Sequence, residues 1–240
     1  MGTSERQSAG SRKVGGFAAL YLALAYIAAF PYYLVVVDYQ GATTAAEKVA
    51  LVIGNYPSMY AMYVASYMVF GIALAVLAFA LHDRLQVHAP TAARLATAVA
   101  LLWSAALVAT GMIYTYGMTT IVALAKTDPA QAIAAWLGIE PVALGLGSAG
   151  GEFLGGLWVL LVSWVALRSG LLPKALGWLG VAVGMAGLVS VMPPLKDATY
   201  AFGLLQIVWF AWVGVVLLRT KAPASEHASV PLNAVPVASE

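Results

Sequence analysis

An all-α membrane protein, with six transmembrane helices in one bundle, is the fold class that this sequence predicts. Hydrophobic residues make up 62% of the 240 residues and charged residues only 9%, against roughly 25% charged residues in a soluble domain. Apolar runs recur along the chain, each close to the about 20 residues that a helix needs to cross a hydrocarbon core of about 30 Å. We therefore expect a bundle whose outer surface contacts the lipid bilayer.

Six apolar runs qualify as spans, and their charged residues lie at the ends, apart from Glu152 in the fourth run. The first run is longer than the apolar part of a signal peptide, so we interpret it as a retained span. The predicted spans cover residues 14–37, 58–81, 93–116, 142–167, 175–192 and 200–218. Together they form one domain, 14–219. The tails, 1–13 and 220–240, are rich in Ser, Ala and Pro and are expected to be disordered.

The distribution of cations predicts the orientation of the bundle. Nine of the 12 Lys and Arg residues fall in the two tails and in the second and fourth loops, whereas Lys48, Lys126 and Lys196 fall on the opposite side. Cytoplasmic loops carry the excess of Lys and Arg, so both termini are expected to be cytoplasmic.

Turn residues mark several expected helix ends. Pro90 and the pair Asp128-Pro129 favour helix starts, and Gly170 followed by Pro173 favours a tight connection. Two longer outer loops, 38–57 and 117–141, each contain a segment that suits a helix lying flat at the membrane interface. Plain connectors with some amphipathic character explain these two loops equally well.

The stretch from residue 151 onward resembles an uncharacterised bacterial family of six-span membrane proteins, classed as a domain of unknown function. The similar features are GGLWVLL at 155–161, the hairpin Leu-Pro-Lys-Ala-Leu at 172–176 and the closing run FGLLQIVWFAWVGVVLLR at 202–219. The likeness is strongest over 127–219. It implies a six-span fold in the bacterial inner membrane and brings no known activity or functional residues.

Glu152 is the one ionisable residue that the predicted spans place inside the membrane. A carboxylate there costs a few kcal/mol unless it is paired, protonated or hydrated, and intramembrane ionisable residues often mark functional sites. The alternative is a structural carboxylate at a helix start. Gly147, Gly151 and Gly155 are spaced to form a stripe on which another helix, from this chain, a second copy or a membrane partner, could pack closely.

Polar side chains in the outer third of the other predicted spans favour a pocket at the depth of Glu152. Tyr60, Tyr116 and Tyr200 fit an aromatic belt at the membrane surface. The deeper residues line a cavity or form hydrogen bonds between helices. The predicted ligand-binding residues are Glu152, Tyr67, Gln206, Tyr63, Tyr32 and Tyr114.

Several chemistries are disfavoured. The chain has no Cys, so thiolate nucleophiles and thiolate metal sites are excluded. His82, Asp83 and His88 do not form a coherent metal-ligand pattern and fit a solvated loop. No cofactor, metal, nucleic-acid partner or enzymatic activity is therefore expected.

The hypothesis that follows is a membrane protein that binds or translocates a small cationic or amphiphilic molecule through a pocket in the outer leaflet. The alternative is a non-catalytic accessory or scaffold subunit, packed on a partner through its glycine stripes. The residues do not name a substrate.

Overall fold

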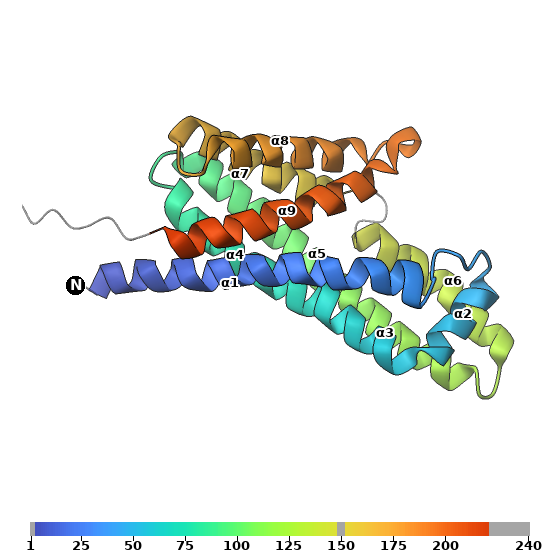
Figure 1. Ribbon diagram of the computed structural model, residues 1–240. Coiled ribbons are helices and arrows are strands. Elements are labelled where there is room, and N and C mark those ends of the chain that lie inside the picture. Colours follow the sequence, from blue (N-terminus) through green and yellow to red (C-terminus); the bar gives the residue numbers. More distant parts are fainter. Residues whose placement is uncertain (1–2, 148–151, 221–240) are drawn as a thin grey trace, which may run out of the picture.

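The computed structural model describes residues 3–147 and 152–220, and these residues form an all-α bundle without strands (Figure 1). The predicted fold class, all-α, is confirmed. The helices are α1 Thr3–Pro31, α2 Ala45–Gly54, α3 Tyr56–Tyr63, α4 Phe70–Leu85, α5 Pro90–Leu124, α6 Pro129–Leu146, α7 Phe153–Ser169, α8 Lys174–Val189 and α9 Ala198–Arg219. Two π-helical segments, η1 Tyr32–Val36 and η2 Val64–Val69, continue α1 and join α3 to α4, and a short 3-10 turn, η3 Pro193–Leu195, precedes α9.

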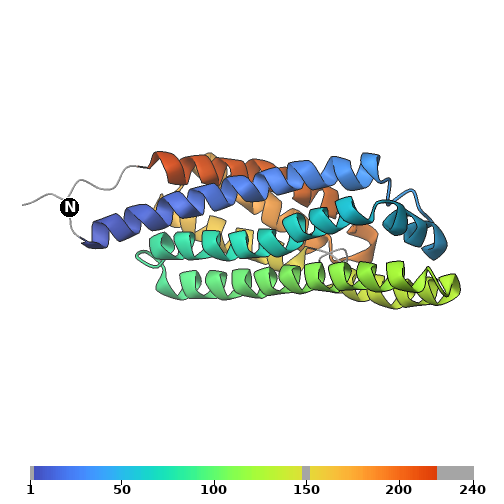
Figure 2. The same ribbon diagram turned by 90° about the horizontal axis from the view of Figure 1, so that it is seen from below.

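The long helices pack side by side along one bundle axis. α1 lies between α4 and α9, α4 packs on α5, α5 on α6 and α7, and α8 closes the bundle between α7 and α9. Figure 2 shows α1, α4, α5 and α9 running nearly along the same direction. The C-terminal part of α5, with α2 and α6, extends beyond the end of α9 (Figure 1).

Both described chain ends lie at the same end of the bundle. Arg12 donates from Nη1 to the carbonyl of Thr220, at 2.8 Å, and Ser11 donates to Asp83 at 2.8 Å. α1 already begins at Thr3, inside the segment 1–13 that was expected to be disordered. This segment contains no proline to stop the helix. Residues 221–240 lie outside the described part of the chain.

Five helical segments among the described residues are long and apolar enough to cross a membrane: 10–36, 56–85, 90–124, 129–146 and 198–219. Helices α7 and α8 are apolar but shorter, with 17 and 16 residues. The chain is therefore a multi-pass helical protein of the membrane type, and the predicted number of six spans stays a prediction.

The prediction of one continuous helix over 142–167 is wrong. α6 ends at Leu146 and α7 begins at Phe153. Gly145 and Gly147 lie at this end of α6, and glycine weakens a helix through its greater backbone freedom. Nevertheless α6 and α7 lie one after the other along α5 and run in the same direction. Their contacts pair Ile139 with Gly117, Gly147 with Thr110, and Gly155 with Trp103.

The two segments that were expected to be longer loops, 38–57 and 117–141, differ in structure. α2 is a separate short helix, with Thr44 and Glu47 forming a reciprocal cap at its start. In contrast, the segment after Asp128 is α6, which runs along α5. This segment was expected to be an interfacial helix or a plain connector. The expected helix starts at Pro90 and Pro129 and the stop at Gly170, where φ is +69°, are confirmed.

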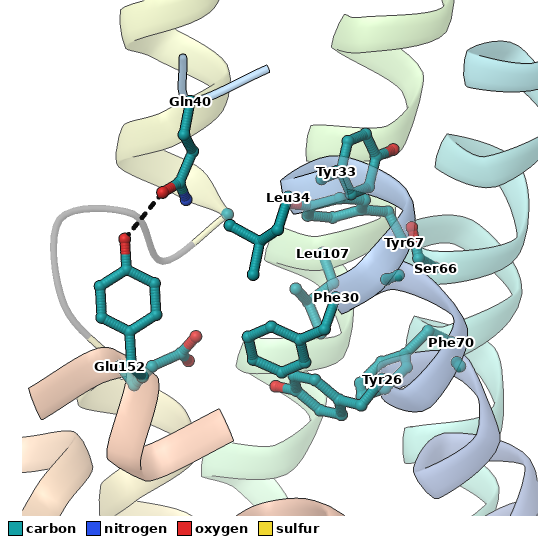
Figure 3. Close-up of a pocket in the computed structure, with 14 residues that line it drawn as sticks. Tyr26, Phe30, Tyr33, Leu34, Gln40, Ser66, Tyr67, Phe70, Leu107 and Glu152 are labelled. Atoms are coloured by element: carbon teal, nitrogen blue, oxygen red, sulfur yellow. Dashed lines mark hydrogen bonds between the residues drawn. The ribbon is translucent and has the colours of Figure 1, made fainter. Parts of the chain in front are cut away.

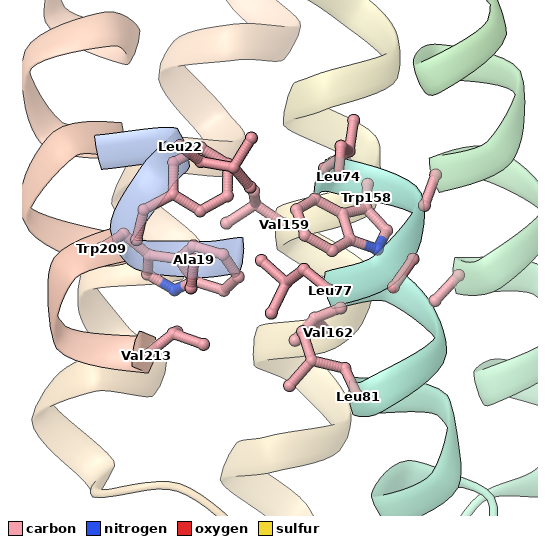
Figure 4. Packing of buried hydrophobic residues seen from close by; sticks show 14 of the residues in the cluster. Ala19, Leu22, Leu74, Leu77, Leu81, Trp158, Val159, Val162, Trp209 and Val213 are labelled. Carbon is pink, nitrogen blue, oxygen red and sulfur yellow. The ribbon is translucent and has the colours of Figure 1, made fainter. Parts of the chain in front are cut away.

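The interior of the bundle is filled by large apolar side chains from α1, α4, α7 and α9. Figure 4 shows Leu22, Leu74, Trp158 and Trp209 meeting in this core, and all four are almost fully buried. Glycines on one face of α8 serve packing. Gly184 and Gly187 lie against Gly156 of α7, so the two helix backbones approach closely.

We predict that Gly156→Ala destabilises the bundle by about 1–3 kcal/mol through overpacking. An added Cβ would lie 2.8 Å from the Gly184 carbonyl oxygen and 2.9 Å from the Leu188 nitrogen, both backbone atoms. Gly138→Ala is the matched control, since a Cβ there meets nothing within 4 Å. Thermal unfolding in detergent should show a lower Tm for Gly156→Ala only. Equal Tm values for the two variants would contradict the close α7–α8 contact.

Candidate functional site

A cavity of about 220 Å³ lies where the α6–α7 interruption meets α1, η2 and α9. Figure 3 shows Glu152 on one side of it and the rings of Tyr26 and Phe30 on the other. Above them, Tyr200 donates a hydrogen bond to Gln40 at 2.9 Å, joining α9 to the loop after η1. The lining residues are Ala25, Tyr26, Ala29, Phe30, Tyr33, Leu34, Gln40, Ser66, Tyr67, Phe70, Leu107, Gly147, Glu152 and Tyr200.

The interruption between α6 and α7 places Glu152 at this cavity. Glu152 is the residue immediately before α7, and its side chain makes no hydrogen bond that caps this helix. Its backbone N–H donates to the Ser190 hydroxyl at 2.9 Å, and its carbonyl accepts from Gly156 at 2.7 Å. The residue is only 8% exposed. Non-helical backbone at membrane depth is tolerated where protein surrounds it or where it lines a hydrated cavity, and Glu152 meets this condition.

Two π-helical segments border the same cavity. In η1 the N–H of Val37 donates to the Tyr32 carbonyl at 2.9 Å, five residues back, and in η2 the N–H of Phe70 donates to Ala65. The Ala65 carbonyl also accepts from the Tyr21 hydroxyl at 2.7 Å. π-helical turns are rare and occur frequently at functional sites. The sequence analysis missed both, because nothing in apolar periodicity reveals one extra residue in a turn.

The predicted ligand-binding residues divide into three groups. Glu152 and Tyr67 line the cavity. Tyr63 and Tyr114 lie behind Tyr67 and stack on each other, with ring centroids 4.3 Å apart. Tyr32 donates to the Ser58 hydroxyl at 2.7 Å and is not among the lining residues.

Gln206 belongs with Tyr32 to the third group, the residues away from the cavity, and it lies on α9 in the packed interior of the bundle. It is fully buried, and neither Nε2 nor Oε1 has a hydrogen-bond partner within residues 3–147 and 152–220. It does not line the cavity. The structure thus brings Glu152 and Tyr67 together and leaves Gln206 outside the candidate site.

Besides Tyr200, four aromatic residues of the site were missed: Tyr26, Phe30, Tyr33 and Phe70. Tyr26, Phe30 and Tyr33 are spaced by four and three residues, which places them on one face of a helix. This spacing was the signal that could have found them. Tyr200, expected to be a belt residue, lines the cavity as well, whereas Tyr116 is 79% exposed.

The expected glycine stripe does not form one helix face. Gly147 follows α6 and meets Thr110, whereas Gly155 belongs to α7 and meets Trp103 and Phe202. Gly151 lies outside the described residues. Gly147 and Gly155 therefore serve contacts within this chain.

Glu140 in α6 is a second buried acid, 8% exposed, that the sequence analysis placed in an outer loop. It pairs with Lys48 of α2 at 2.7 Å and accepts from the Tyr39 hydroxyl at 2.8 Å. Trp136 in turn donates to the Tyr39 oxygen at 3.1 Å. Burial first, and then the bond to Glu140, raises the pKa of Tyr39, so this hydroxyl stays a donor. The network fastens α2 and the loop after η1 to α6.

Position along α5 separates the cavity from this network. At about 1.5 Å per residue, Leu107 of the cavity lies about 20 Å along the helix from Arg94. Gly117, which contacts Ile139 beside Glu140, lies about 35 Å from Arg94. The cavity is therefore deeper in the bundle than the Glu140 network.

The comparison with known families places the chain in one of them. A protein-family model described as "Domain of unknown function (DUF4386)" matches residues 17–220. The chain belongs to the DUF4386 family. The matched region runs from α1 to the end of α9, so the whole helical bundle is the DUF4386 domain, and membership of a family of unknown function is confirmed. No curated protein and no solved structure matches the chain.

We predict that Lys48→Met destabilises the outer end of this DUF4386 bundle by about 2 kcal/mol, because it leaves the buried Glu140 without its cation. Adding Glu140→Gln should recover part of the loss, since a neutral amide can still accept from Tyr39. Hydrogen exchange over 45–54 measures the effect. Lys126→Met, at an exposed lysine of the same end, is the control. Equal exchange in Lys48→Met and Lys126→Met would contradict the role of the ion pair.

Proposed function

We propose that the protein binds a small cationic or amphiphilic molecule in the cavity beside Glu152, and that it binds or translocates this molecule without catalysing a reaction. The observation that carries the proposal is the composition of the lining. Glu152 is an acid, and the 14 lining residues include no Lys, Arg or His. A cation is the ligand that such a lining favours, because a cleft whose ionisable groups carry one sign of charge attracts the opposite charge.

An amphiphile fits the side of the cavity formed by α1. Ala25, Ala29 and Leu34 are apolar lining residues, and Leu34 is 39% exposed on the outside of the bundle. An apolar tail could lie along this side while its charged group lies near Glu152. This arrangement would let a ligand enter from the lipid as well as from the aqueous side.

We predict that Glu152→Gln weakens binding of hexylammonium by about tenfold or more, since a hydrogen bond to a charged group contributes about 1.5–3 kcal/mol. Calorimetry on protein in lipid nanodiscs, with empty nanodiscs as the blank, measures the affinity. Hexanoate has the same chain and the opposite charge and should not bind.

Asp197→Asn is the matched control, because it removes an exposed acid that does not line the cavity. Equal affinity of Glu152→Gln and the unchanged protein for hexylammonium, or binding of hexanoate as tightly as hexylammonium, would contradict the proposal.

The proposed location is a bacterial inner membrane, with six crossings and both termini in the cytoplasm. One crossing would consist of α6 and α7 together. The cation excess favours this orientation: Arg12, Arg84, Arg94 and Arg168 belong to the end of the bundle that also carries the two described chain ends.

Single-cysteine labelling tests the orientation, since the chain has no Cys of its own. A maleimide that cannot cross the membrane, added to intact cells, should label Lys126→Cys and leave His88→Cys unlabelled. Labelling of His88→Cys alone would reverse the orientation, and labelling of both would contradict the proposed crossings.

The alternative role as an accessory subunit rested on the glycine stripes. Gly155 of α7 and Gly184 and Gly187 of α8 make their close contacts inside the chain. These contacts do not support a partner surface at the glycines, and the cavity beside Glu152 supports ligand binding instead.

A further inference from the structure

The cavity is lined by aromatic rings to an unusual degree. Six of its lining residues are aromatic, and one is an acid. These aromatic residues are Tyr26, Phe30, Tyr33, Tyr67, Phe70 and Tyr200. Ring faces attract cations within about 6 Å of their centroids, and clusters of rings are the usual means by which proteins recognise methylated ammonium groups.

The rings form two walls, and within each wall the rings contact one another or share a neighbouring ring. Tyr26 lies 5.9 Å from Phe30 at 25° and 5.3 Å from Phe70 at 84°. On the other wall, Tyr33 and Tyr67 both contact the ring of Tyr63, at 5.4 and 5.7 Å. Differently oriented rings surround a rounded group better than one flat stack does. Figure 3 shows Glu152 facing the Tyr26 and Phe30 wall across the cavity.

A primary ammonium group carries three N–H donors, each of which needs an acceptor inside the cavity. Ser66 donates to the Met62 carbonyl at 2.6 Å, and Tyr200 donates to Gln40. Glu152 is the one anionic acceptor among the lining residues. An N–H donor that is removed from water and finds no acceptor costs free energy. A fully methylated ammonium group has no N–H donor, so it avoids this cost.

We propose that the ligand of this cavity is a quaternary ammonium compound, with its methylated head between the aromatic walls and Glu152 as the counter-charge. The inference rests on the proposed function and deepens it. An apolar substituent lies along Ala25, Ala29 and Leu34. The rings select for methylation, and Glu152 selects for positive charge.

The experiment compares hexyltrimethylammonium with hexylammonium in nanodiscs, by calorimetry. The methylated compound should bind about tenfold more tightly, as expected for desolvated cation–π contacts. Tyr26→Leu should abolish most of this preference, and Tyr26→Phe should keep it, because phenylalanine retains the ring. Tyr116→Leu, at a tyrosine outside the cavity, is the control, and a Tm for each variant verifies folding.

The outcomes separate the two proposals. If both compounds bind equally, or hexylammonium binds more tightly, the quaternary ammonium assignment is wrong while cation binding stands. If Tyr26→Leu keeps the full preference for the methylated compound, the aromatic wall does not produce it and the assignment is likewise wrong. If neither compound binds, the proposed function fails together with the inference.

Discussion

Backbone groups inside a bilayer need hydrogen-bond partners within the protein, and this constraint governs the interruption between α6 and α7. The ends of the interruption are secured inside the bundle. The Gly147 N–H donates to Ala143, and the Glu152 N–H donates to Ser190 of the connection after α8. The chain can therefore leave the helical path without exposing the described backbone to lipid. A carboxylate that an unbroken helix would carry along its face lies instead at a helix start, beside a cavity.

The glycines make this arrangement possible through packing. Gly156, Gly184 and Gly187 bring α7 and α8 together, which holds Ser190 within reach of Glu152. On the opposite side, Gly111 of α5 lies directly against Tyr67 and Met68 of η2. The π-helical turn thus packs closely on α5 while Tyr67 contributes to the cavity. The helix contacts of the bundle and the shape of the cavity have a common origin in these small residues.

The sequence predicted the features that depend on local chemistry, such as the helical class, the helix starts at Pro90 and Pro129 and the turn at Gly170. It predicted Glu152 and Tyr67 as members of one site, because an intramembrane acid stands out. The break after Leu146 was not predicted, although the Gly-rich stretch 145–151 carried a signal for it, since glycine weakens a helix. The sequence analysis also failed for Glu140, whose partners Lys48 and Tyr39 are far away in the chain. Such contacts depend on how α2 and α6 fold onto α5.

Access to the cavity beside Glu152 is the central claim, and a chain without cysteines allows it to be measured directly. Ser66→Cys, at a residue that lines the cavity together with Glu152, should react with a trimethylammonium-bearing methanethiosulfonate reagent added from outside, and hexyltrimethylammonium should slow the reaction. Val159→Cys, at a fully buried position of α7, should stay unlabelled. Reaction at 66 that ammonium compounds slow would support a hydrated, cation-binding cavity. If Ser66→Cys is as inert as Val159→Cys, the cavity is closed to solutes, and the account of the cavity as a binding site is wrong.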